Sequence, residues 1–250
     1  MNKEVEKKLL QEIAKLQKEM RELKGEDSSI PIYSFSKIKN SDLKNIVDIK
    51  LNINESKFDY IFNNDIIISD ETTLFLETLI AKIKPLIKYY REEDLKIHFL
   101  AHLFGKINFT SYKNRFRDFY NAKLVYKNDK FILQGEADFM LASGLVDSEK
   151  PYFFIQEFKK EQSNSYPEPQ LLAELISAVE LNNESVMEGA YIVGAIWNFV
   201  ILEKVGKDSY EYYVSYNFDS TKIDDLKNIY KNLVFIKNKI IKKIQNTSKE

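Results

Sequence analysis

The chain has 250 residues, of which 44% are hydrophobic and 13% aromatic, enough for one domain of ordinary size plus an appendage. The formal net charge is −1, which excludes a globally basic nucleic-acid coat, so any nucleic-acid contact must come from local patches. The absence of cysteine excludes disulfides, thiolate nucleophiles and cysteine-based zinc sites. We see neither a signal peptide nor an apolar run of about 18 residues, and therefore expect a cytoplasmic protein without a membrane span.

Residues 1–25 predict a helical arm that stands apart from the rest of the chain. Its apolar side chains follow the spacing of a heptad seam, at Leu9, Ile13, Leu16, Met20 and Leu23. A lone helix with such a narrow apolar stripe is marginal in water, so it needs a partner. We predict a coiled-coil-like helix that forms a homodimer or binds a partner protein. The alternative is that it packs on its own globular domain.

A lead-in segment over residues 26–70 contains two short strand-like stretches, at 30–35 and 46–53. Asp70 then resembles an N-cap, and Pro85 is expected to kink or split the helix that follows. From here the patterns predict two helices, three strands, a helix, two strands and a helix, over residues 71–90, 92–104, 119–126, 130–141, 152–159, 170–181, 190–202, 209–216 and 221–245. We therefore expect an α/β domain over residues 71–250, with a mixed central sheet flanked by helices.

Three residues on neighbouring predicted strands carry the chemistry. Glu157 and Lys159 are two positions apart, so they share one face of a strand while Phe158 points to the other. Asp138 lies on the preceding strand, and the connection of about a dozen residues allows the two strands to pair. Converging carboxylates are hard oxygen ligands suited to Mg²⁺, which activates water and neutralises a phosphate under attack. A neighbouring ammonium stabilises the developing charge, and the backbone carbonyl of Phe158 is a further candidate ligand.

This arrangement resembles the PD-(D/E)XK nuclease superfamily over roughly residues 71–205. The superfamily core has the same order of helix, three strands, helix and strand, although no proline precedes Asp138 here. Gln170, at the start of the helix after the Glu-x-Lys strand, matches a glutamine found in RecB-like nucleases and in nuclease domains of type I restriction motor subunits. The resemblance implies a restriction-endonuclease-like fold and a Mg²⁺-dependent nuclease, with DNA favoured over RNA and Mn²⁺ able to substitute.

The resemblance also implies a role for each matching residue. Asp138 and Glu157 would hold the ion, Lys159 would assist the attacking water, and Gln170 would position the lysine or the phosphate. Two alternatives stay open. Glu157 could form only an edge-strand salt bridge with Lys159 or Lys160, or the chain could be a catalytically inactive nuclease-fold subunit that binds nucleic acid or assembles with a partner protein.

Other residues are secondary candidates. Glu136 and Glu77 are further possible metal ligands, with a salt bridge and a solvated helix face as their respective alternatives. His98 and His102 have a spacing that can bind zinc, but the base of a HExxH motif and a third ligand are missing, so we interpret them as surface or packing residues. The basic residues expected to contact nucleic acid are Lys113, Arg115, Arg117 and Lys160. The lysines of the C-terminal helix are either a phosphate-binding surface or a solvated face, and they are Lys227, Lys231, Lys237, Lys239, Lys242 and Lys243.

Overall fold

The computed structural model describes residue 12 and residues 30–159 and 166–247. The helical arm predicted over residues 1–25 lies outside the described residues apart from Glu12, and so does Lys160. Within the described ranges, no helix combines the length and the apolar character that crossing a membrane requires.

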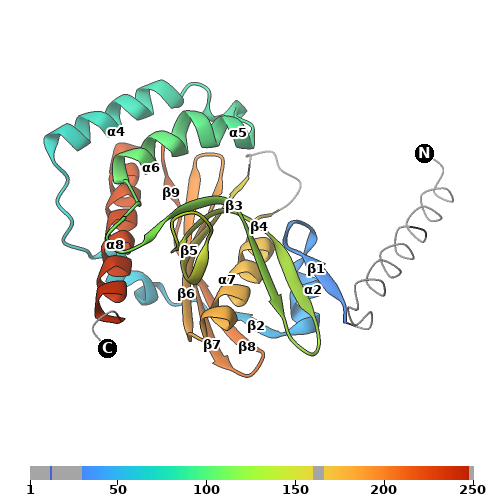
Figure 1. The fold of residues 1–250 in the computed structure, drawn as a ribbon. Coiled ribbons are helices and arrows are strands. Elements are labelled where there is room, and N and C mark those ends of the chain that lie inside the picture. The colour runs from blue at the N-terminus through green and yellow to red at the C-terminus, as the bar shows by residue number, and fades with distance from the viewer. Residues whose placement is uncertain (1–11, 13–29, 160–165, 248–250) are drawn as a thin grey trace, which may run out of the picture.

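The described chain consists of helices and the strands of one sheet (Figure 1). The strands are β1 (Ile32–Ser34), β2 (Asp48–Leu51), β3 (Phe116–Lys127), β4 (Ile132–Ser143), β5 (Glu149–Lys159), β6 (Val186–Val193), β7 (Ile196–Gly206), β8 (Ser209–Val214) and β9 (Phe218–Asp219). The α-helices are α2 (Asn40–Ile46), α3 (Asp59–Phe62), α4 (Asp70–Ile83), α5 (Glu92–Leu95), α6 (Ala101–Ile107), α7 (Glu168–Asn182) and α8 (Ile223–Thr247). A short 3₁₀ turn, η1 (Phe35–Lys37), follows β1, and a π-helical turn, η4 (Lys96–Leu100), joins α5 to α6.

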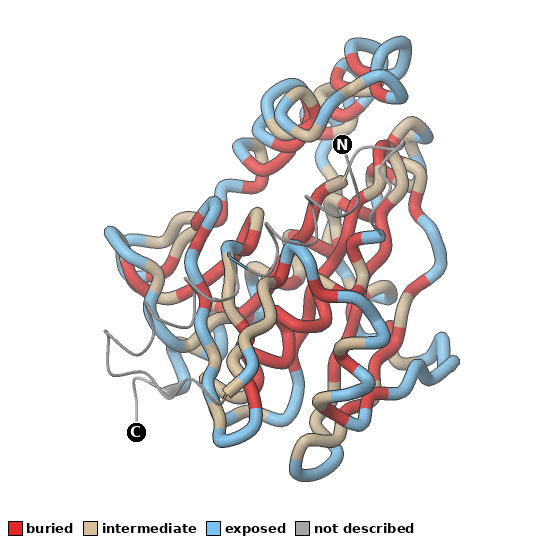
Figure 2. Tube along the Cα trace, turned by 90° about the vertical axis from the view of Figure 1, so that its right-hand side faces the viewer, coloured by how far each residue is buried: buried red, intermediate tan, exposed pale blue. Residues whose placement is uncertain are grey.

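The strands form a mixed sheet in the order β1-β4-β5-β6-β7-β8-β2, with β3 along the outer side of β4 and β9 beside β7. The pairs β1–β4, β5–β6 and β2–β8 are parallel and the others are antiparallel. One hydrophobic cluster joins the sheet to α4, α6 and α8, and a second joins its other face to α2 and α7. Figure 2 shows buried residues running through the strands and exposed residues at the turns. The predicted mixed sheet flanked by helices is confirmed.

Strand β4 pairs with two different strands, β1 and β5, along one of its edges. Its other edge pairs with β3 along almost its whole length. On the shared edge, residues 132–134 pair with β1 and residues 139–143 pair with β5, which leaves residues 135–138 between the two ladders. Phe35 of η1 packs against this stretch, and a Cβ added to Gly135 would lie 2.7 Å from its ring. The sheet therefore contains a fork, with β1 and β5 as its arms and residues 135–138 of β4 at its base.

Two predicted boundaries were wrong, and the expected break of a helix at Pro85 was confirmed. The apolar run 190–202 is not one strand, because the chain reverses at Gly194, whose φ of +58° suits a glycine in a turn. Both strands are mostly buried, so no polar residues mark the reversal. The N-cap of α4 is Ser69, whose side chain accepts from the Thr72 N–H at 3.2 Å, rather than Asp70. The helix predicted over residues 71–90 is split at Pro85 as expected. Helix α4 ends at Ile83, because Pro85 has no N–H to donate and its ring clashes with the carbonyl four residues earlier.

Candidate functional site

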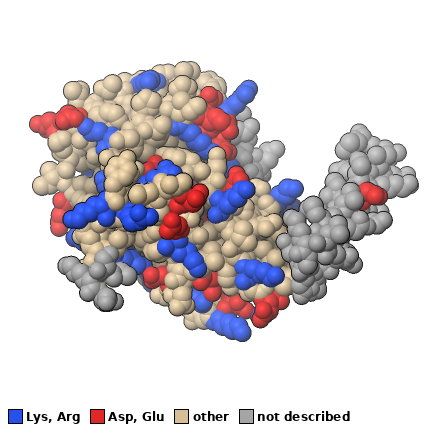
Figure 3. Space-filling model, in the orientation of Figure 1, with Lys and Arg blue, Asp and Glu red and all other residues tan. Residues whose placement is uncertain are grey.

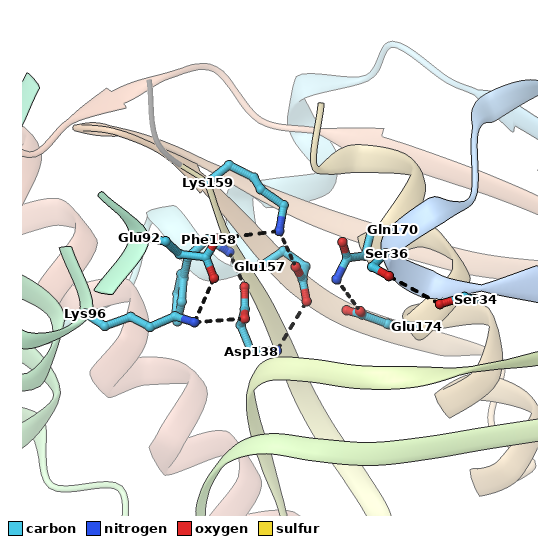
Figure 4. A network of polar contacts seen from close by, with 10 residues as sticks. All are labelled: Ser34, Ser36, Glu92, Lys96, Asp138, Glu157, Phe158, Lys159, Gln170 and Glu174. Carbon is cyan, nitrogen blue, oxygen red and sulfur yellow. Dashed lines mark hydrogen bonds and ion pairs between the residues drawn. The ribbon is translucent and has the colours of Figure 1, made fainter. Parts of the chain in front are cut away.

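Asp138 and Glu157 meet at the fork. The β4–β5 ladder ends at the Phe139–Gln156 pair, so the next residues cannot bond backbone to backbone in the usual way. Instead, the Asp138 N–H donates to Glu157 Oε1 at 3.2 Å, and the Phe158 N–H donates to Asp138 Oδ2 at 3.0 Å (Figure 4). Each carboxylate thus satisfies a backbone donor on the other strand. This reciprocal pair of hydrogen bonds brings the two acidic groups together.

Helix α7 places a third carboxyl group beside Glu157. Glu174 is fully buried, as is Glu157, and its Oε1 accepts from Gln170 Nε2 at 3.2 Å. Its Oε2 is buried without a hydrogen-bond partner among the described residues. Gln170 is therefore close to the site, as expected, but its observed contact is with Glu174 and not with Lys159.

Two lysines lie close to the carboxylates of Asp138 and Glu157. Lys159 Nζ lies 3.4 Å from Glu157 Oε2 and 3.9 Å from Glu92 Oε2. Lys96, from the π-helical turn, donates to Asp138 Oδ1 at 3.0 Å and to Glu92 Oε1 at 2.9 Å. Figure 4 shows these side chains converging from β4, β5 and the α5–η4 segment. Every carboxylate oxygen of Asp138 and Glu157 thus has a donor.

Burial and charge perturb the ionisation of the site. Burial, and after it the charge of Asp138, raises the pKa of Glu157 from 4.5 to about 8, against the opposing charge of Lys159. Burial and the charge of Glu157 raise the pKa of Glu174 well above the usual carboxyl range. Burial alone would lower the pKa of Lys159 and of Lys96, but the neighbouring carboxylates outweigh it and both values are raised. The two lysines thus stay charged near neutral pH, while the buried carboxyl pair, Glu157 and Glu174, retains a proton.

The donor set fits Mg²⁺ with two side-chain ligands. Mg²⁺ is commonly held by one or two carboxylates, with water and substrate phosphate in its other positions. Each oxygen of Asp138 and Glu157 keeps a second lone pair after accepting one hydrogen bond. The carbonyl of Phe158 faces β4 as its N–H does, since both groups of a strand residue point to the same edge. In the described ranges no three His, Asp or Glu side chains form a metal-binding group, so a closed cage of protein ligands is not present.

Among the described residues, the secondary acidic and histidine candidates do not form a metal-binding group with Asp138 and Glu157. Glu77 is exposed on α4, and Glu136 is exposed on β4 opposite Lys123 of β3. His98 and His102 are both exposed, and the His98 ring packs beside Tyr90 at 5.6 Å between centroids. The zinc reading therefore has no third ligand among the described residues.

The loop before β3 that carries Lys113 and Arg115, here called the basic loop, lies away from the carboxylates of Asp138 and Glu157. Phe116, which follows the loop, pairs with Ser143, at the opposite end of the β4–β5 ladder from Asp138 and about 16 Å along the strand. Lys113 and Arg115 are exposed there. Arg117 instead donates to the carbonyl oxygens of residues 118 and 146 and stacks on Phe119, which makes it a structural residue.

The lysines of α8 divide between structural and exposed roles. Lys237 donates to the Ile107 carbonyl at 3.0 Å, Lys239 pairs with Glu188, and Lys243 pairs with Glu184 at 2.6 Å. These three contacts tie α8 to neighbouring elements. On the face that Figure 3 presents, basic and acidic side chains are interspersed and do not form one continuous basic surface.

The sequence interpretation missed three members of the site. Glu174 could have been noticed in the sequence, because it is the one acidic residue in the otherwise apolar run Leu171–Ile176, where a charge needs a reason. Glu92 and Lys96 had none, because a Glu and a Lys four positions apart are typical of any solvated helix. Only the tertiary packing of the α5–η4 segment against β4 brings them to Asp138.

No protein-family model matches this sequence, and no curated protein matches it. The geometry around Asp138, Glu157 and Lys159 is therefore the main indication of function.

Proposed function

We propose that this protein is a Mg²⁺-dependent nuclease that hydrolyses phosphodiester bonds in nucleic acid, with DNA favoured over RNA. One observation carries the proposal. The carboxylates of Asp138 and Glu157 meet where the β4–β5 ladder ends, and the Lys159 ammonium lies 3.4 Å from Glu157. Charged groups gathered in a largely buried sheet are costly unless they are paired or bind something, so the arrangement favours a functional site over a chance salt bridge.

The chain order supports a restriction-endonuclease-like fold. A helical segment, α4 to α6, precedes the antiparallel strands β3, β4 and β5, and α7 then connects β5 to the parallel strand β6. This is the αβββαβ order of the PD-(D/E)XK core that the sequence resembles. Asp138 and the Glu157-x-Lys159 motif occupy the second and third strands of that order, as the resemblance requires.

Each residue has a defined part in the proposed reaction. Asp138, Glu157 and the Phe158 carbonyl would hold the ion, which supplies positive charge to the phosphate and favours ionisation of water. The Lys159 ammonium stabilises negative charge on the attacking oxygen and on the phosphate. Water attacks phosphorus, the bond to the leaving oxygen breaks, and that oxygen takes up a proton. Gln170 donates to Glu174, which is buried beside Glu157, so these two residues support the acidic cluster and do not contact the phosphate.

A cleavage assay tests the proposal. Plasmid, single-stranded DNA and RNA are incubated with the protein in Mg²⁺, Mn²⁺ or EDTA. We expect cleavage that needs the metal and falls by a factor of about 10² to 10³ in Lys159→Ala, since a charge-stabilising donor is removed. Lys106→Ala is the matched control, because Lys106 pairs with Glu71 on the surface of another helix. Cleavage that survives both Lys159→Ala and Asp138→Ala would remove the site assignment.

A non-catalytic nuclease-fold subunit that binds nucleic acid or a partner protein is the second candidate. The observation that favours it is the Lys96 ammonium, which already neutralises Asp138 at 3.0 Å. This reading predicts that no tested nucleic acid is cleaved in either metal, while the folded protein still binds one of them.

A further inference from the structure

A groove of about 570 Å³ opens beside β6 and β7, next to the end of β5 that carries Lys159. In the sheet register, Tyr191 lies beside Glu157 and Val193 lies beside Lys159, and both Tyr191 and Val193 line the groove. The Gly194 N–H also donates to the Lys159 carbonyl oxygen at 2.9 Å. Neighbouring strands are about 4.8 Å apart. The groove therefore begins one strand away from the candidate active site.

Two tyrosines form one wall of this groove. The rings of Tyr166 and Tyr191 meet edge to face at 5.6 Å between centroids, and their hydroxyl groups are 2.8 Å apart. Tyr191 is buried, whereas Tyr166 is 59% exposed. The buried ring fixes the exposed one, so a large aromatic surface is held in contact with solvent. Nucleobases of every kind can stack on such surfaces, so this contact does not depend on the nucleotide sequence.

Cationic and amide groups complete the groove, together with one carboxylate, Asp219. That carboxylate accepts from Thr221 and lies 3.7 Å from the Lys222 ammonium. Lys84 and Lys88, from the segment after α4, line it and are exposed, and neither forms an ion pair with another described residue. Asn198 Nδ2 donates to Asn217 Oδ1 at 2.8 Å, which leaves the Asn198 amide oxygen and the Asn217 amide nitrogen without described partners. Ammonium groups neutralise phosphates, and side-chain amides can bond the edges of bases. The groove thus combines the three kinds of contact that a nucleotide needs.

We propose that the Tyr166–Tyr191 groove binds an unpaired nucleotide of the substrate strand, adjacent to the phosphate at Lys159, so that the substrate is single-stranded nucleic acid. This inference rests on the nuclease proposed above. A volume of about 570 Å³ lies within the range of small-ligand sites. The bases of a duplex are already stacked and paired, so only an unpaired base can present its face to Tyr166.

The test measures binding separately from cleavage. A fluorescent oligothymidine of about 12 nucleotides and a hairpin duplex are titrated in EDTA against the Lys159→Ala protein. We expect the single strand to bind more tightly than the duplex. Adding Tyr166→Ala should weaken single-strand binding about tenfold, while Tyr166→Phe retains it. Tyr112→Ala is the comparison, because Tyr112 is 80% exposed and lies beside Lys113 in the loop before β3, which is the competing surface for nucleic acid. Each of these tyrosines is largely exposed, so the substitutions leave the core intact.

The outcomes separate the groove from the catalytic proposal. Equal binding of strand and duplex, or a loss in Tyr112→Ala but not in Tyr166→Ala, would overturn the groove. If cleavage depends on Lys159 but is unchanged in Tyr166→Ala, the groove proposal is wrong and the nuclease proposal stands. If the single strand binds in a way that depends on Tyr166 but the protein cleaves no nucleic acid, the groove proposal is supported and the nuclease proposal is wrong.

Discussion

Glu157 is a carboxylate that water does not reach, since its side chain is 0% exposed, whereas that of Asp138 is 13% exposed. Burying an acidic group is costly unless it is paired or protonated. The Asp138 N–H and the Lys159 ammonium both donate to Glu157, and its raised pKa favours the protonated form, so the cost of its burial is reduced. The raised pKa keeps Glu157 protonated near neutral pH, which lowers the cost of burying it when no metal ion is bound.

The raised pKa of Glu157 predicts how stability changes with pH. Between 4.5 and about 8 the folded chain retains a proton that the unfolded chain releases, so the free energy of unfolding falls as pH rises through this interval. Glu157→Gln imitates the protonated form and should make this slope shallower, leaving the contribution of the buried Glu174. The change is at most about 1.4 kcal/mol per pH unit. Urea denaturation in EDTA at several pH values measures it, and parallel curves for the two proteins would refute the prediction.

Lys96 predicts a change in metal affinity. Its ammonium occupies one oxygen of Asp138, where it repels any cation that binds there. Lys96→Met keeps an unbranched side chain but removes the ammonium, which lies 5.6 Å from the centre of the Phe158 ring. We expect Mn²⁺ to bind about tenfold more tightly, measured by electron paramagnetic resonance. Lys106→Met should leave the affinity unchanged, and weaker Mn²⁺ binding in Lys96→Met would show that Lys96 supports the site rather than competing for it.

At the scale of the elements, the fork in β4 explains why the acidic residues face a common point. A continuous β1–β4 or β4–β5 ladder would pair the backbone groups of residues 135–138 and leave no role for side-chain acceptors. The ladders stop short, and the side chains of Asp138 and Glu157 take over as acceptors. Phe35 fills the space at the base of the fork, over Gly135. The position of the site therefore depends on the packing of η1 against β4.

Two glycines test the importance of this packing. A Cβ at Gly135 would lie 2.7 Å from the Phe35 ring, so Gly135→Ala should lower the free energy of unfolding by about 1–3 kcal/mol. A Cβ at Gly105 in α6 meets nothing within 4 Å, and Gly105→Ala should raise it by about 1 kcal/mol. Chemical denaturation compares the two variants. Equal effects would mean that the fork tolerates extra volume and does not fix the site.

Local pattern was sufficient for most elements but not for the fork. The strand around Asp138 and the strand ending in Glu157-x-Lys159 were predicted because their apolar residues and turn positions are local. The hairpin at Gly194 was missed because both of its strands are mostly buried and read as one apolar run. The contact of Lys96 with Asp138 joins residues 42 positions apart, and no local pattern encodes it.

At the scale of the whole molecule, the sheet places the site between two layers of helices. The helical segment from α4 to α6 packs on one face and α7 on the other, and they contribute Lys96 and Glu174 respectively. Composition and element order predicted this mixed sheet flanked by helices. Strand order was not predictable, because β1 and β2 come from the lead-in segment and pair with strands about 100 to 160 residues away.

The heptad seam of residues 1–25 predicts that the full chain forms a dimer. A second copy would bury the apolar stripe that a lone helix leaves exposed. Sedimentation velocity on the full chain and on residues 26–250 tests this. We expect the full chain to sediment as a dimer and the shortened chain as a monomer. A dimer that persists without residues 1–25 would assign self-association to another surface.

The most direct test of the account is a crystal of the protein soaked in Mn²⁺ and measured at a wavelength that reveals anomalous scattering by manganese. The central claim is that Asp138, Glu157 and the Phe158 carbonyl hold one divalent ion beside Lys159. We predict a single anomalous peak within about 2.0–2.3 Å of oxygens from both carboxylates, with the Lys96 ammonium displaced from Asp138. No peak at the fork, with Lys96 still bound to Asp138, would contradict the account.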